Sequence, residues 1–202
     1  MGYRIVEPPK RRADGKTYCG ADRYEPSQVL QPKRHSRLGR LWQEWAVDRQ
    51  RFVGDDERWH CMIRDLGDAL DYRKRFSEFG VQFEVVGIHL CESRAHFEQV
   101  RIMKNYIGLD VSLLCGQSAL HPAGLPTPID EGPAHLLPLW RLERAYFVPR
   151  LNRYGLLDSF DDAMLLRDFT RTLGKIAPEE HEPEYVDTEV LGITYEFHSG
   201  EK

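Results

Sequence analysis

The chain has 202 residues, of which 41% are apolar and 11% aromatic, and its formal net charge is −4. A chain of this length suits one domain and can bury most of its apolar surface. No apolar run approaches the roughly 20 residues that span a bilayer, and the first residues lack the apolar segment of a secretory signal. We therefore expect a soluble cytoplasmic protein with no membrane association.

Charge is distributed unevenly along the chain. Residues 1–40 carry ten Lys/Arg against four Asp/Glu, whereas residues 158–202 carry four against twelve. Oppositely charged ends serve as partner surfaces or attract each other within the fold. Pro and Gly recur through residues 1–36 and predict an irregular basic arm, within which residues 3–6 can add an edge strand. Residues 37–202 are predicted to form a single domain.

The first elements of that domain follow from apolar spacing and turn residues. Residues 37–49 place apolar side chains three and four positions apart, which predicts an amphipathic helix. Residues 58–63 are a candidate strand. Asp65 is a predicted N-cap for a helix over 66–79, because its carboxylate can accept bonds from the first backbone amides.

The stretch 81–115 is predicted to form a strand, a helix and a second strand. Residues 81–91 are rich in β-branched and aromatic side chains on both faces, which is typical of a strand covered on both sides. Residues 109–114 give a second short apolar run. Together they predict a β-α-β unit.

The helix of this unit is predicted over residues 95–107. Its apolar side chains gather on one face, as in a helix that lies on a sheet. Ser93 or Glu92 is suited to its start. Gly108 is placed where a left-handed C-cap fits.

Residues 116–138 hold many Pro and Gly residues and predict a long loop, a feature that is often functional. Helical spacing resumes over 139–148, and Pro149 is expected to bend or stop that helix.

The last third of the chain begins with a predicted turn at 152–155. Ser159 then has the position of an N-cap for a helix over 160–173, with Gly174 as its C′ residue. Residues 189–197 predict a final strand. The resulting fold class is α+β (mixed α/β), with one central mixed sheet packed by about four to five helices.

Several His and Cys residues are candidate metal ligands or nucleophiles. His89, Cys91 and His96 offer ligand types close in sequence, but they fall on a strand and a helix with no pair to complete a zinc set. His60 and Cys61 are neighbours in a strand and point to opposite faces, so they cannot activate each other. We expect no metal and no cofactor.

Four scattered cysteines, without any CxxC pair, predict reduced thiols buried as small apolar residues: Cys19, Cys61, Cys91 and Cys115. Cys115 alone lies at a strand end before a loop, where sites of α/β enzymes occur. The phosphate, dinucleotide and metalloprotease motifs are absent. One alternative is therefore a small enzyme that uses Asp110, Cys115 and the loop 116–138 as a lid.

Two short segments carry a resemblance to a known class of proteins. Ile-Gly-Leu-Asp-Val at 107–111 follows the β-α-β helix, and Leu-Asn-Arg-Tyr-Gly-Leu at 151–156 precedes the Ser-capped helix. In this order the chain resembles bacterial immunity and immunity-like proteins of polymorphic toxin systems, over about residues 58–197. The resemblance implies a non-catalytic protein that binds a cognate toxin domain and covers its active site or substrate groove.

An acidic surface would suit a basic, nucleic-acid-attacking toxin through charge complementarity. The residues proposed for toxin binding are Asp161, Asp162, Glu179, Glu180, Glu182 and Glu184. The same acidity argues against direct nucleic-acid binding by this chain. A third hypothesis is an adaptor that recruits another protein through the basic arm.

Overall fold

The structure is a computed structural model, and it describes residues 2–6, 10–11, 17–18, 40, 48, 51–53, 62–78, 83–112, 118–119, 137–176 and 188–197. Four predictions fall largely outside these ranges: the helix over 37–49, the strand over 58–63 apart from its last two residues, the end of the helix at 79, and most of the loop 116–138.

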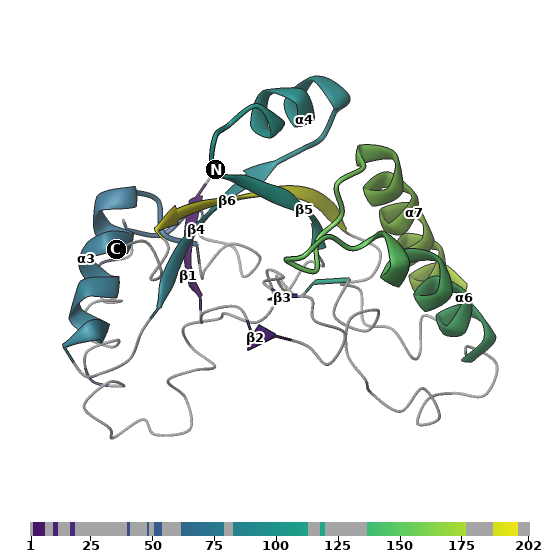
Figure 1. The fold of residues 1–202 in the computed structure, drawn as a ribbon, viewed down its shortest axis with the longest axis horizontal. Coiled ribbons are helices and arrows are strands. Elements are labelled where there is room, and N and C mark those ends of the chain that lie inside the picture. The colour runs from purple at the N-terminus through teal and green to yellow at the C-terminus, as the bar shows by residue number, and fades with distance from the viewer. Residues whose placement is uncertain are drawn as a thin grey trace.

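The core of the fold is a four-stranded sheet in the order β1-β4-β6-β5 (Figure 1). The strands are β1 (Gly2–Val6), β4 (Glu84–Leu90), β5 (Tyr106–Ser112) and β6 (Glu189–Phe197). Every pair of neighbouring strands is antiparallel. The α+β class is therefore confirmed, whereas the prediction of a mixed sheet is wrong for these four strands.

The final strand lies between the two strands of the predicted β-α-β unit. Leu191 of β6 pairs with Leu90 of β4 on one side and with Asp110 of β5 on the other. β4 and β5 thus run in the same direction without bonding to each other. Local sequence carries no signal for this arrangement, because a strand that is apolar on both faces can pair with any suitable neighbour.

The N-terminal segment contributes an edge strand, as predicted. β1 pairs antiparallel with β4, and on its other side Tyr3 exchanges two backbone bonds of 2.7 Å with Ile63. Two further strands, β2 (Lys10–Arg11) and β3 (Thr17–Tyr18), form a separate antiparallel pair. Within the predicted arm, these short segments are therefore strands.

Four α-helices are found within the described residues: α3 (Leu66–Ser77), α4 (Arg94–Arg101), α6 (Leu137–Phe147) and α7 (Phe160–Ile176). α3 lies at the β1 end of the sheet, α4 lies over it, and α6 and α7 lie side by side at the β5 end (Figure 1). The 3-10 turn η4 (Val148–Arg150) follows α6 and contains Pro149. The α-helix stops there, as predicted.

Three predicted helix caps are confirmed. Asp65 Oδ1 accepts a bond of 2.7 Å from the amide of Gly67 at the start of α3. Ser93 and Ser159 accept bonds of 3.2 Å from the third amide beyond them, at the starts of α4 and α7. Each such cap stabilises its helix by about 1 kcal/mol.

Two predicted helix ends are wrong. α4 ends at Arg101, and Tyr106 and Ile107 belong to β5. Gly108 is not a C-cap: it lies in β5 at an irregular register, with φ of 147°. Gly174 is buried inside α7, which continues to Ile176. At Gly108 strand pairing overrides the local signal for a helix end, and at Gly174 the helix continues two residues beyond the predicted glycine cap.

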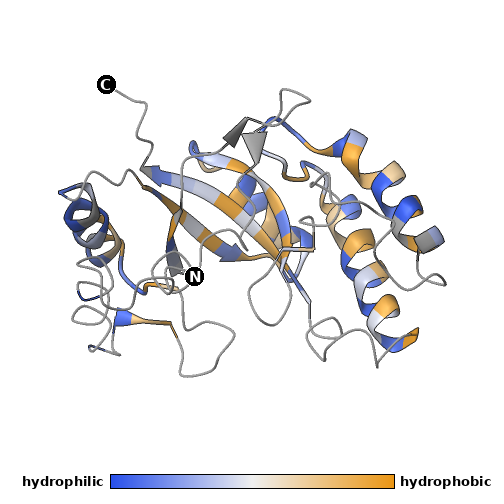
Figure 2. Ribbon diagram, turned by 90° about the horizontal axis from the view of Figure 1, so that it is seen from below, coloured by the Kyte–Doolittle hydropathy of each residue, from blue (hydrophilic) through white to orange (hydrophobic). Residues whose placement is uncertain are grey.

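Helix α4 lies close to β6 because Gly192 of that strand has no side chain. A Cβ on Gly192 of β6 would lie 2.8 Å from Val100 Cγ1 of α4 and 3.2 Å from Cys91 Sγ. The glycine therefore lets the helix approach the sheet closely. Figure 2 shows apolar residues along the strands, and helices α6 and α7 with apolar and polar residues alternating around them.

Candidate functional site

The two segments that carry the resemblance to immunity proteins lie side by side. Leu109 and Leu157 exchange backbone bonds of 2.7 and 2.9 Å, and Asn152 Nδ2 donates to the carbonyl of Ile107 at 2.8 Å. A Cβ on Gly108 would lie 2.6 Å from Leu156 Cβ, so only glycine fits there without displacement. Residues 107–109 and 152–157 thus form one packed unit at the β5 edge of the sheet.

Asn152 organises the turn within this unit. Its Oδ1 accepts from the amides of Tyr154 at 2.9 Å and Leu156 at 3.2 Å, and its Nδ2 also donates to Asp158 at 2.7 Å. An Asn that bonds to the backbone ahead of it stabilises a turn. The predicted turn at 152–155 is confirmed, and it leads directly into the first acidic residues of α7.

Of the six residues proposed for toxin binding, the structure describes Asp161 and Asp162, and Asp161 is the more exposed. Its side chain is 78% exposed and forms an ion pair with Arg94 at the start of α4. The Arg94 guanidinium lies 5.5 Å from the centre of the Phe160 ring, and that ring stacks on Phe97 of α4 at 5.4 Å. The carboxylate is therefore held at the outer edge of an aromatic contact between α4 and α7.

Asp162 points toward α6 and η4. Its side chain is 22% exposed, accepts from the Tyr146 hydroxyl of α6 at 3.3 Å, and lies 3.7 Å from Arg150 Nε. The Arg150 guanidinium also stacks on the Tyr146 ring at 3.6 Å. Asp162 thus joins α7 to α6 and η4, so a partner reaches it less readily than Asp161. The structure does not bring the two carboxylates to one exposed point.

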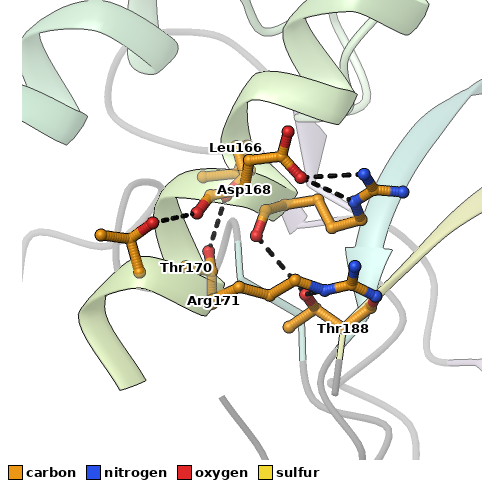
Figure 3. A network of polar contacts seen from close by, with 7 residues as sticks. Leu166, Asp168, Thr170, Arg171 and Thr188 are labelled. Carbon is orange, nitrogen blue, oxygen red and sulfur yellow. Dashed lines mark hydrogen bonds and ion pairs between the residues drawn. The ribbon is translucent and has the colours of Figure 1, made fainter. Parts of the chain in front are cut away.

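The remaining proposed toxin-binding residues, Glu179, Glu180, Glu182 and Glu184, lie outside the described residues. The residue that follows their segment is fixed to α7, as Figure 3 shows. Arg171 donates to the carbonyl of Thr188 at 2.5 Å and to its hydroxyl at 3.1 Å. Because Thr188 is fully buried, this contact fixes the start of β6 to α7.

A chain of polar side chains crosses the sheet and was not predicted. His89 Nε2 of β4 lies 3.0 Å from the Thr194 hydroxyl, which donates to Glu196 Oε1 at 2.7 Å. Asn105 Nδ2 donates to the same carboxylate at 3.0 Å. A Cβ on Gly87 would lie 2.5 Å from the Thr194 hydroxyl oxygen, so the three groups converge where β4 has no side chain.

This arrangement defines the chemistry of His89. Because the Thr194 hydroxyl donates to Glu196, it accepts from His89, which places the imidazole proton on Nε2. Burial lowers the pKa of His89, and the Glu196 carboxylate opposes that effect. The ring is therefore neutral at pH 7.

The other two candidate metal ligands lie apart from each other: His96 is exposed on α4, and Cys91 is buried just after β4. The described residues contain no cluster of three or more metal-type ligands.

Cys91 was a candidate metal ligand, and Asp110 belongs to the enzyme hypothesis. Burial raises the pKa of the Cys91 thiol to about 11, so it is not a thiolate near neutral pH. Asp110 is fully buried and accepts from the amide of Val111 at 2.9 Å and from the Ser118 hydroxyl. Cys115 lies outside the described residues, as do Cys19, His60 and Cys61.

Glu143 of α6 is a buried carboxyl group that the sequence did not single out. Its side chain belongs to a residue that is 6% exposed. Burial raises the pKa of Glu143 to about 7, with Arg144 acting in the opposite direction. Its neighbours on α6, Leu142 and Arg144, are more exposed, so Glu143 is the acidic residue on the inward face of that helix.

Comparisons with known proteins found no matching family model, no matching curated protein and no matching solved structure. Within the described part of the chain, no helix is long and apolar enough to span a membrane.

Proposed function

We propose that this protein is a non-catalytic immunity protein that binds a cognate bacterial toxin domain in the cytoplasm and covers its active site or substrate groove. The observation that carries the proposal is the packing of residues 107–111 against residues 151–157. The two segments that resemble immunity proteins form one unit, and α7 follows it directly. A resemblance that falls on one packed unit is stronger support than two unconnected short segments.

The surface proposed for binding is centred on Asp161. Its carboxylate is exposed and is held by Arg94 over the stacked rings of Phe97 and Phe160. A side chain fixed before binding loses less conformational entropy on association. Its partner on the toxin is a cationic side chain of the kind that contacts phosphates. Asp162 supports this surface from beneath through Tyr146 and Arg150.

We favour binding over catalysis because the resemblance is to non-catalytic inhibitors. The Cys91 thiol is protonated near neutral pH because of burial, and the Asp110 carboxylate accepts structural bonds from Val111 and Ser118. The enzyme alternative places its site near Cys115, which lies outside the described residues, and Ser118 of its loop donates to Asp110.

The test is growth of bacteria that express the toxin domain encoded directly upstream of this gene. We expect the wild-type protein to restore growth and Asp161→Lys to reduce protection, with the complex weakened at least about 10-fold, as expected for loss of a close interfacial charge pair. Asp71→Lys is the matched control, because Asp71 is an exposed carboxylate paired with an Arg on α3.

Two outcomes contradict the proposal, and a third contradicts only its acidic surface. The first is the absence of a secreted-toxin gene beside this gene, and the second is growth arrest in cells that contain the wild-type protein and the neighbouring toxin. Full protection by a variant that replaces all six acidic residues with their amides contradicts the acidic surface specifically.

A further inference from the structure

The turn between α4 and β5 presents apolar side chains to solvent. Ile102 is 81% exposed and Met103 is 39% exposed. Ile102 has the highest exposure of the large apolar residues in the described part of the chain, and Met103 follows it directly. Single exposed apolar residues are common, and two in succession give a small apolar surface that a partner can cover. Figure 1 shows this turn at the end of the helix that stands over the sheet.

The turn is held in a fixed shape by the neighbouring strand. The amide of Tyr106 donates to Met103 at 3.1 Å, and the amide of Tyr195 on β6 donates to Asn105 at 2.9 Å. The Asn105 side chain donates to the Tyr195 carbonyl at 2.6 Å and to Glu196 at 3.0 Å. A rigid apolar turn is ordered before it meets a partner, so binding costs little conformational entropy.

Basic residues flank the two apolar side chains. Arg101 lies 5.9 Å above the Phe97 ring and 3.5 Å from Glu98, which fixes its guanidinium beside the helix. Lys104 is exposed, and no ion pair of its ammonium group is found among the described residues. The turn therefore carries two cationic groups, one of them paired with Glu98, in a chain whose net charge is negative. A complementary partner surface has an apolar floor and an acidic rim.

We infer that this turn, residues 101–104, is a docking knob that inserts into an apolar groove with an acidic rim on the toxin domain. The inference rests on the proposed function and names the second contact of the same interface. α4 has eight residues, so about 12 Å of helix separates the knob from the Arg94 end. A standard interface of about 800 Å² per partner spans both ends.

The apolar and basic side chains of the knob indicate what kind of toxin groove it fits. A carboxylate-rimmed cleft is the form of hydrolytic active sites that use carboxylates as general acids or bases or to hold metal ions. A knob that fills such a cleft blocks substrate directly, while Asp161 engages the cationic surface beside it. An anionic membrane is a poorer fit, because Glu98 of α4 and Glu92 just before that helix are both exposed, and two apolar side chains give little insertion.

The test measures the Kd of the purified protein for the neighbouring toxin domain by calorimetry. We expect Ile102→Ser to weaken binding about 10- to 100-fold, the worth of burying one large aliphatic side chain. Lys104→Glu is expected to slow association, most strongly at low salt. Leu142→Ser is the matched control, because Leu142 is 62% exposed on α6, and its Kd should equal that of the wild type.

The outcomes separate the inference from the function on which it rests. Wild-type binding with an unchanged Kd for Ile102→Ser overturns the knob and leaves the proposed function standing. Absence of wild-type binding overturns both. Sedimentation with phosphatidylserine vesicles that is lost in Ile102→Ser, together with an unchanged toxin Kd, assigns the knob to a membrane and also overturns the inference.

Discussion

Replacing Glu143 by glutamine should change how the stability of the protein depends on pH. Burial raises the pKa of this carboxyl to about 7, from an ordinary value of 4.5. The unfolded chain therefore loses its proton at lower pH than the folded chain does. Below pH 4.5 both states are protonated and there is no penalty, and the folded state is progressively disfavoured as pH rises from 4.5 to 7.

The size of the effect follows from the separation of the two pKa values. The penalty is about 3 kcal/mol at pH 8 and under about 1 kcal/mol at pH 5, as an order-of-magnitude figure for a buried group. Glu143→Gln removes the ionisable group. The variant should therefore gain about 2 to 3 kcal/mol relative to the wild type between pH 5 and pH 8.

The assay is urea unfolding followed by tryptophan fluorescence at both pH values. The readout is the change in the difference between variant and wild type, so a constant cost of the amide cancels. Leu142→Gln introduces the same amide one residue earlier at an exposed position, and should show the pH dependence of the wild type. Identical pH dependence in Glu143→Gln and wild type would refute the reasoning.

Three further predictions concern contacts that define the fold. Gly192→Ala should lower the free energy of unfolding by about 1 to 3 kcal/mol, because the new Cβ would lie 2.8 Å from Val100 Cγ1. Urea unfolding measures this free energy, and partial recovery in the double variant with Val100→Ala confirms the contact. Arg171→Ala should cost about 1 to 3 kcal/mol in the same assay, because it removes the bonds to buried Thr188; an unchanged unfolding midpoint contradicts the anchor. Because burial lowers the pKa of His89, its ring should titrate below 6.5 by NMR, and a midpoint at or above 6.5 contradicts that placement.

Local signals in the sequence predicted most of the elements. Asp65, Ser93 and Ser159 each cap the helix that follows them, because capping depends on the few residues around a helix start. The final strand, residues 189–197, has the predicted bounds. These features need no information from distant parts of the chain.

The errors come from long-range pairing. Tyr106 and Ile107 have helical spacing but join β5, because Tyr106 and the residues from Gly108 onward pair with β6 and Ile107 lies at the register shift between them. Gly108 is the residue type that often follows a helix end, yet here the absence of its side chain makes room for Leu156. The central position of β6 depends on residues about 100 positions apart, which no local pattern encodes.

The candidate site was predictable only where the signal was local. Asp161 is exposed at a helix start, as its position after Ser159 indicated. The chain from His89 through Thr194 to Glu196 joins residues 105 positions apart and depends on strand register. The exposure of Ile102 was hidden because the predicted helix continued past it.

The most direct test of the central claim is titration of this protein into the purified toxin domain encoded beside its gene, with toxin activity as the readout. A stoichiometric inhibitor should lower the activity linearly and abolish it at one equivalent. Full toxin activity at several equivalents contradicts the account, and so does time-dependent inactivation by far less than one equivalent, which indicates catalysis.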